Sequence, residues 1–92
     1  MYNNSSLSGK LIIPNSVTGI SQSAFTGSSL TQVVIPNSVT SIGSVAFGRC
    51  RSLTLITYNG TIAQWNAIQK SSSWGSMSYI NIHCTDGIVR NF

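Results

Sequence analysis

Apolar and polar positions alternate in short runs along the chain. In one such run, Val33 and Ile35 alternate with Gln32 and Val34. This period of two predicts a short strand that turns Val33 and Ile35 inward. The proline at the next position ends the strand, because it has no N–H group and a fixed φ. The apolar residues that follow are expected to complete the interior of the same unit: Val39, Ile42, Ala46 and Phe47.

This unit occurs more than once. Residues 13–25 align with residues 35–47 at an offset of 22 without a gap, and nine of the 13 positions are identical. A single unit of this size cannot bury its apolar face alone. We therefore expect stacked units that share one continuous core.

Two further matches give the period. Residues 30–35 match residues 53–58 at an offset of 23. Leu7 precedes Leu30 by 23 as well, which requires one inserted residue near Gly9 in the first unit. A period of this length is typical of leucine-rich repeats.

The repeated residues resemble a particular family. The string Ile-Pro-Asn-Ser-Val-Thr-x-Ile, followed by Ala-Phe and by Cys50 three residues after Phe47, resembles the BspA-like leucine-rich repeats. This match covers residues 7–58. Residues 58–65 (Tyr-Asn-Gly-Thr-x-x-x-Trp), together with Cys-Thr-Asp-Gly at residues 84–87, resemble the segment that often closes such arrays.

The resemblance implies a fold and a location. The fold is a β-rich α/β solenoid, a leucine-rich repeat with short parallel strands, short helical turns and a C-terminal helix–strand cap. The family is known mainly from surface and secreted proteins of bacteria and some protists, which implies a cell-surface or secreted location and roles in adhesion. The sequence departs from the family where Asn4 and Ser28 replace the cysteine. Ser16 and Ser38 occupy the Asn/Cys column of better-known repeats, so a hydrogen-bonded ladder there must use hydroxyls.

The pattern changes after residue 58, which divides the chain into repeats (1–58) and a capping segment (59–92). Thr61 and Gln64 have the spacing of a capping box, which predicts a helix over residues 61–70 that ends near Lys70. Residues 79–84 alternate as a strand, and Ile82 follows Tyr58 at an offset of 24, where a fourth strand belongs. The helix is then expected to replace the return path of the third unit.

The apolar side chains of the capping segment indicate a lid. Ile62, Trp65 and Ile68 recur every three residues and form one stripe on the expected helix. Trp65 and Trp74 are large enough to cover the open end of the core, a role that we favour over stacking on a ligand.

Composition excludes most catalytic chemistry. Of 92 residues only 7% are charged, with five Lys and Arg and one acidic residue, Asp86. One carboxylate side chain cannot supply the pair needed for glycoside hydrolysis or a calcium cluster. Asp86 and the single histidine, His83, lie too close along one strand end for a Ser–His–Asp triad. We therefore predict that the chain is not an enzyme and has no cofactor.

The cysteines and the positive charges add little further chemistry. Cys50, Cys84 and His83 number three, whereas a structural zinc site needs about four ligands, so no metal is expected. Two buried free thiols are favoured over a disulfide, and adjacent residues on a strand point to opposite faces, which separates Cys84 from His83. Five scattered positive charges are not a nucleic-acid-binding stripe. The longest apolar run is too short for membrane insertion.

The strand pattern leaves one set of side chains facing outward, and these are the candidate ligand-binding residues. We predict a non-enzymatic module for protein–protein recognition or adhesion, with a protein ligand such as a host or cell-surface protein. The alternative is a purely structural, self-associating scaffold without a ligand of its own. The candidate residues are Lys10, Ile12, Gln32, Val34, Leu55 and Thr57, with Asn81 and His83 as possible additions.

The N-terminal residues predict self-association. Alignment places Met1 on Phe47, so the chain starts in the middle of a unit. The first unit should then expose the edges of its apolar side chains to water. Association through this uncapped N-terminal edge, as a homodimer or a larger oligomer, would cover them. The residues concerned are Leu11, Ile13, Val17, Ile20 and Phe25.

Overall fold

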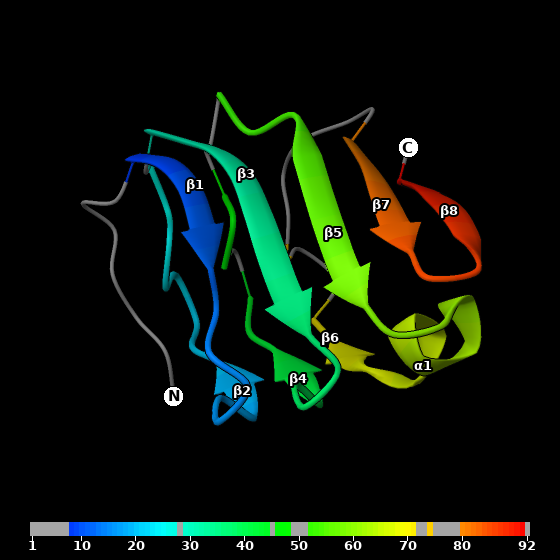
Figure 1. The fold of residues 1–92 in the computed structure, drawn as a ribbon. Helices are drawn as coiled ribbons and strands as arrows, with labels where there is room; N and C mark the ends of the chain where they lie inside the picture. The colour runs from blue at the N-terminus through cyan, green and yellow to red at the C-terminus, as the bar shows by residue number, and fades with distance from the viewer. Residues whose placement is uncertain are drawn as a thin grey trace.

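The computed structural model describes residues 8–27, 29–44, 46–48, 52–71, 74 and 80–91. These residues form two sheets between which the chain alternates (Figure 1). The predicted short parallel strands are confirmed. The large sheet has the order β1 (Ser8–Ile12), β3 (Ser29–Pro36), β5 (Leu55–Asn59), β7 (Ile80–Cys84) and β8 (Gly87–Asn91). The small sheet consists of β2 (Gly19–Ile20), β4 (Ser41–Ile42) and β6 (Gln69–Lys70).

The strand register follows the sequence repeat. Ile35 pairs with Tyr58 across β3 and β5, as the period predicts. The fourth strand, β7, is also present, but Ile82 pairs with Ile56 rather than with Tyr58. The expected spacing was therefore wrong by two residues. Because side chains alternate with a period of two, this shift leaves the inward and outward faces of β7 as predicted.

The pairing of β1 with β3 is irregular near Gly9, as expected, but the extra residue lies in β3 and not in β1. Gly9 pairs with Leu30, whereas Lys10 pairs with Gln32, so Thr31 is the extra residue and lies in β3. The expected insertion in the first unit is wrong. Gly9 has a φ of +73°, in the left-handed region that glycine adopts without strain. The irregular pairing therefore lies next to a residue that can bend the backbone at little cost.

The return paths contain single hydrogen-bonded turns at the positions where short helical turns were expected. The Ala24 N–H donates to the Ser21 carbonyl at 3.1 Å, and the Ala46 N–H donates to Gly43 at 3.2 Å. These i to i+3 bonds belong to single turns. The helix α1 (Ile62–Ala67) is the only helix in the described part of the chain. The return paths thus contain single hydrogen-bonded turns, one of them ending at Ala46, and no regular helix among their described residues.

The helix α1 is shorter than the predicted span of residues 61–70. Its capping box is confirmed: the Gln64 N–H donates to Thr61 Oγ1 at 3.1 Å, and the Thr61 N–H donates to Gln64 Oε1 at 2.9 Å. The helix ends at Ala67 because Ile68 is extended, with φ −65° and ψ 132°. The next two residues pair with β4 as the strand β6. The helix thus precedes the return strand of the third unit and does not replace it.

The core lies between the two sheets. Its buried side chains come from both sheets, from the turns and from α1. The expectation that Ile13, Ile20 and Phe25 expose their edges is wrong, because they are 2%, 0% and 0% exposed. Their side chains point between the sheets, where the next unit covers them: the Phe25 ring stacks on Phe47 at a centroid distance of 5.2 Å. Leu11 and Val17 are half-buried. Residues 1–7, on which the predicted N-terminal edge also depends, lie outside the described residues.

Hydroxyl groups connect successive units, as the serine column predicted. Ser38 Oγ donates to the Val17 carbonyl at 2.7 Å. Thr40 Oγ1 donates to the Thr18 carbonyl at 3.2 Å, beside a backbone bond from the Thr40 N–H to the same oxygen at 2.9 Å. These hydroxyl groups thus add side-chain hydrogen bonds between successive units just before the strands of the small sheet.

The aromatic rings form a chain through the core. The Phe47 ring meets Trp74 edge-on at 6.2 Å, and Trp74 meets Trp65 at 5.5 Å. Trp65 in turn meets Tyr58 at 5.4 Å. Trp65 is 2% exposed and Trp74 is half-buried. Trp65 therefore belongs to the core, and Trp74 packs against it, in line with the predicted core role of both rings.

Candidate functional site

The outward-facing positions of the large sheet form two rows. Along each strand they alternate with core positions such as Val33, Ile56 and Ile82, which are fully buried. Strand pairing aligns them from β1 to β8, and we call this surface the outer face. The first row consists of Lys10, Gln32, Leu55, Asn81 and Arg90. The second row consists of Ile12, Val34, Thr57, His83 and Ile88.

The structure places all six predicted binding residues on the outer face. Lys10 and Ile12, on the edge strand β1, are exposed. The other four are half-buried, because each lies between two neighbouring strands. Asn81 is half-buried and His83 exposed in the same rows. Sequence parity therefore identified this face correctly; its role in binding remains a prediction.

The sequence analysis missed the last strand of the outer face. β8 pairs antiparallel with β7 and adds Ile88 and Arg90 to the two rows. A signal was present: the Asp-Gly sequence at residues 86–87, one residue after an alternating run, is typical of a β-hairpin, and Thr85 and Asp86 form its two-residue loop. Ile88 is 52% exposed and Ile12 is 64% exposed, so the two large apolar side chains exposed in the described residues lie in one row, on opposite edge strands.

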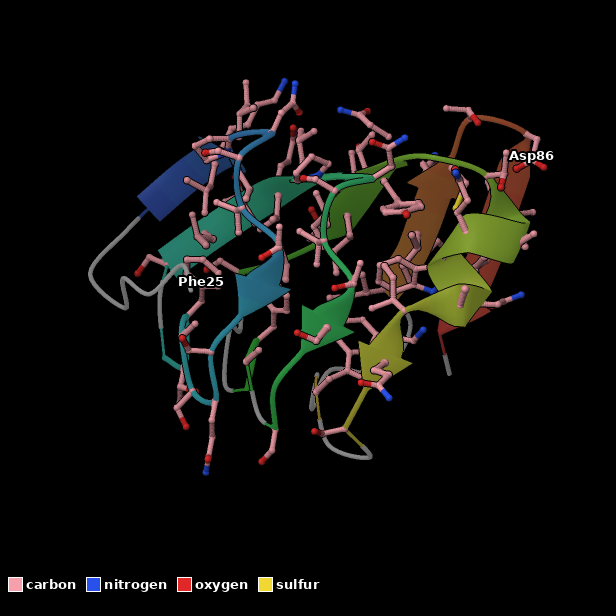
Figure 2. The ribbon with its side chains drawn as sticks, turned by 90° about the horizontal axis from the view of Figure 1, so that it is seen from below. Phe25 and Asp86 are labelled. Carbon is pink, nitrogen blue, oxygen red and sulfur yellow. The ribbon has the colours of Figure 1, made fainter. Side chains whose placement is uncertain are left out.

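Asp86 is committed to the fold. Its Oδ1 accepts a hydrogen bond from the backbone N–H of Ile62 at 2.8 Å, in the first turn of α1. Figure 2 shows Asp86 in the turn between β7 and β8, at the helix. An acidic side chain stabilises this helix end, where N–H groups lack partners. Asp86 therefore serves as a helix cap supplied from another element, a role that the sequence analysis did not predict.

The same hairpin turn fits closely against the start of the helix. The Thr85 N–H and Oγ1 both donate to the Gly60 carbonyl, at 2.9 and 3.1 Å. A Cβ atom on Gly60 would lie 2.6 Å from the Tyr58 ring, and one on Gly87 would lie 2.9 Å from Ile62 Cδ1. Both glycines thus allow a close approach that a larger residue would prevent. The turn fixes β8 beside β7 and completes the outer face.

His83, Cys84 and Asp86 do not form a catalytic arrangement. His83 is exposed on the outer face, whereas Cys84 lies on the opposite side of β7 and packs against the core as a free thiol. Burial raises the pKa of Cys84, and the charge of Asp86 raises it further. A raised pKa lowers the thiolate fraction and hence the reactivity of the thiol. Cys50, the other predicted free thiol, lies outside the described residues.

Lys70 is engaged in the fold as well. In the small sheet, Lys70 pairs with the buried Ile42, which in turn pairs with the buried Ile20. Lys70 itself is half-buried. Its Nζ donates to the carbonyls of Trp65 at 2.8 Å and Ile68 at 3.2 Å, and lies 4.8 Å from the centroid of the Trp65 ring. Burial lowers the pKa of Lys70. Its charge therefore stabilises the carbonyl end of α1.

Among the described residues, hollows also lie away from the outer face, and neither of two such hollows brings a carboxylate or an imidazole into its lining. The larger, of about 440 Å³, lies on the small sheet, and Lys70 is the one titratable residue in its lining. The smaller, of about 170 Å³, lies between α1 and the turn after β3. Within the described ranges no three His, Cys, Asp or Glu side chains come together as metal ligands. None of the described helical residues forms a segment long and apolar enough to cross a membrane.

Comparison with known proteins places the chain in a family. The model described as BspA type leucine rich repeat region (6 copies) matches residues 1–87. No curated protein and no solved structure matches the chain. Leucine-rich repeat domains generally mediate protein–protein interactions and are generally non-enzymatic, and BspA-like repeats are typically surface-associated. With the match covering nearly all of its length, the chain belongs to the BspA-type leucine-rich repeat family.

Proposed function

We propose that this chain is a non-enzymatic protein-recognition module and that its outer face is the binding surface. The observation that supports this most directly is the alignment of outward-facing positions in two adjacent rows across the five strands of the large sheet. Side chains in register on neighbouring strands lie about 5 Å apart, close enough to contact one partner together. The four half-buried positions at the centre give this surface a fixed shape.

The wider architecture of this proposal is a solenoid. The two sheets would be its two walls, with residues 1–58 as the repeats and residues 59–92 as the capping segment. Equal offsets support it, because the partner of Lys10 in the large sheet is Gln32 and the partner of Gly19 in the small sheet is Ser41. The typical surface association of the family supports a cell-surface or secreted location and a role in adhesion.

A self-associating scaffold is the second candidate. The observation in its favour is Ile12, which is 64% exposed on β1, the strand at one edge of the described large sheet. An exposed apolar side chain on an edge strand favours pairing between copies. In this case the chain would form a homodimer or oligomer through its N-terminal edge and bind no other protein. Sedimentation velocity at about 100 µM tests this candidate, and a single monomeric species would contradict it.

Selection from a library of random linear peptides tests the recognition proposal. Peptides enriched on the wild-type chain are measured against Thr57→Arg, at the centre of the outer face, and against Gln22→Arg, in an exposed turn away from it. Both variants gain one positive charge, and thermal melting confirms that both fold. We expect binding to fall about tenfold or more in Thr57→Arg alone, since the long side chain blocks the centre of the face. Failure to enrich any peptide, or equal binding by both variants, would contradict the proposal.

A further inference from the structure

The outer face has an unbalanced charge. The chain contains five Lys and Arg residues and one acidic residue, which gives a net charge of +4. That acidic residue, Asp86, is hydrogen-bonded at the start of α1 and is not one of the ten outer-face positions. The first row begins with the exposed Lys10 and ends at the register position of Arg90. Each edge strand of the described large sheet thus has a basic residue at an outer-face register position, and none of the ten outer-face positions is acidic.

We infer that the partner of the outer face is an acidic protein segment that carries carboxylates close to apolar side chains. This inference rests on the proposed function and names the chemistry of its partner. A partner with carboxylates opposite Lys10 and Arg90 would supply the charge that the chain itself lacks. The positions of the exposed apolar residues favour a protein over other polyanions. Ile12 lies two residues from Lys10, and Ile88 lies two residues from Arg90, so a complementary ligand needs apolar groups beside its charges.

The spacing of these positions defines the partner further. β1 and β8 are separated by four strand spacings, so the backbone positions of Lys10 and Arg90 lie ~19 Å apart. An extended segment of about six residues covers this distance. Its centre would face Gln32, Leu55 and Asn81, a row of uncharged side chains. The partner segment is thus acidic and apolar at both ends and uncharged between them.

The size of the outer face predicts weak and salt-sensitive binding. With strands of five residues across ~19 Å, its projected area is roughly 300 Å². This is well below the area of about 800 Å² per partner in a standard protein–protein interface. Affinity for a single segment should therefore be in the micromolar range or weaker. Its electrostatic part should fall as salt screens the exposed charges.

Peptide titrations followed by NMR test the inference. The probe is a synthetic peptide of about ten residues with Glu-Ser-Leu at each end and Ser and Gly between, compared with versions that carry Gln or Lys in place of Glu. We expect the Glu peptide to shift the amide resonances of β1 and β8, and to bind about tenfold more tightly than the Gln peptide at about 20 mM salt. This difference should largely disappear at about 500 mM salt. The Lys peptide should not bind.

The outcomes separate the inference from the proposed function. Equal binding of the Glu and Gln peptides to the outer face would overturn the acidic partner and leave the recognition surface intact. Shifts confined to other parts of the molecule would overturn both. Absence of binding by the Glu peptide at millimolar concentration would overturn the acidic partner. Tighter binding of a heparin tetrasaccharide to the outer face would assign the face to an anionic carbohydrate and likewise overturn the inference.

A matched pair of variants distinguishes a site from an effect of net charge. Lys10→Gln and Gln22→Glu each lower the net charge by one, but only Lys10 belongs to the outer face. Lys10→Gln should weaken binding of the Glu peptide several-fold at low salt, whereas Gln22→Glu should leave it nearly unchanged. Equal weakening in both variants would show that the peptide responds to net charge alone and would overturn the inference.

Discussion

At the residue scale, the scarce charged side chains stabilise the fold. The carboxylate of Asp86 caps the start of α1, and the ammonium of Lys70 contacts two carbonyl groups at its end. The sequence analysis excluded a catalytic role for Asp86, the only acidic residue, but assigned it no structural role. Its true partner, the Ile62 N–H, is distant in sequence and is brought close only by the β7–β8 hairpin. Such a contact has no local signal in the sequence.

Removal of the Asp86 cap should destabilise the chain. We expect Asp86→Ala to lower the free energy of unfolding by about 1 kcal/mol, because the Ile62 N–H at the helix start loses its acceptor. Asp86→Asn keeps an amide oxygen at the same place and should lose less. Urea unfolding followed by circular dichroism measures both values. If Asp86→Ala unfolds at the same urea concentration as the wild type, the cap contributes nothing measurable.

The Cys84 thiol should react slowly while the chain is folded. Burial raises its pKa, and the charge of Asp86 adds to the shift, so the folded thiol keeps its proton to a higher pH than the unfolded thiol. Alkylation by iodoacetamide near pH 8.5 should then be slower for the folded chain than for the chain in urea. A Cys50→Ser variant restricts the measurement to Cys84. Equal rates in the folded and unfolded chains would contradict this prediction.

At the element scale, the sequence predicts strong local signals and misses elements that depend on pairing. The alternation around Val33 and the capping box at Thr61 act within a few residues, and both are present in the structure. The two-residue strand β6 is too short for any periodicity and exists because Gln69 and Lys70 pair with β4. The same pairing ends α1 at Ala67, three residues before its predicted end.

Tertiary context also explains the role of Trp74. The turn bond from the Trp74 N–H to the Ser71 carbonyl, at 3.0 Å, matches the bonds that end at Ala24 and Ala46 in the earlier units. A large ring thus stands in the third unit where two earlier units have a methyl group. The first two units have the sequence Ala-Phe at this point, whereas the third has Trp-Gly. The large and small residues are exchanged, so a simple alignment of the sequence does not reveal the correspondence.

The aromatic packing around Trp65 should be essential for the stability of the capping segment. Trp65→Ala removes the ring that contacts Tyr58, Trp74 and Lys70, and we expect a loss of about 3–5 kcal/mol. Thermal melts by far- and near-UV circular dichroism measure the effect. Asn66→Ala, at the exposed neighbouring position of α1, serves as the control and should melt like the wild type. An unchanged melting temperature in Trp65→Ala would argue against a core role for this ring.

At the scale of the whole molecule, the sequence repeat aligns the outward-facing positions of successive strands and so makes the outer face one continuous surface. Side chains alternate between the two faces along each strand, and the offsets between strands are nearly equal. The inward and outward positions of β1, β3 and β5 can therefore be identified from sequence alone. The shift of two residues at β7 preserves this division, so His83 lies on the predicted face. The β8 edge of the face could not be placed by period, because β8 is antiparallel and belongs to a hairpin outside the repeat.

The central claim is that the outer face of the large sheet is the surface that binds a protein partner. Chemical-shift mapping of a library-selected peptide on the isotope-labelled chain tests it most directly. We predict that the largest shifts belong to amides of the outer-face positions, above all Gln32, Leu55 and Thr57 at its centre. Largest shifts at the hollow of the small sheet, around Ser41 and Gln69, would contradict the claim and assign binding to the opposite side of the molecule.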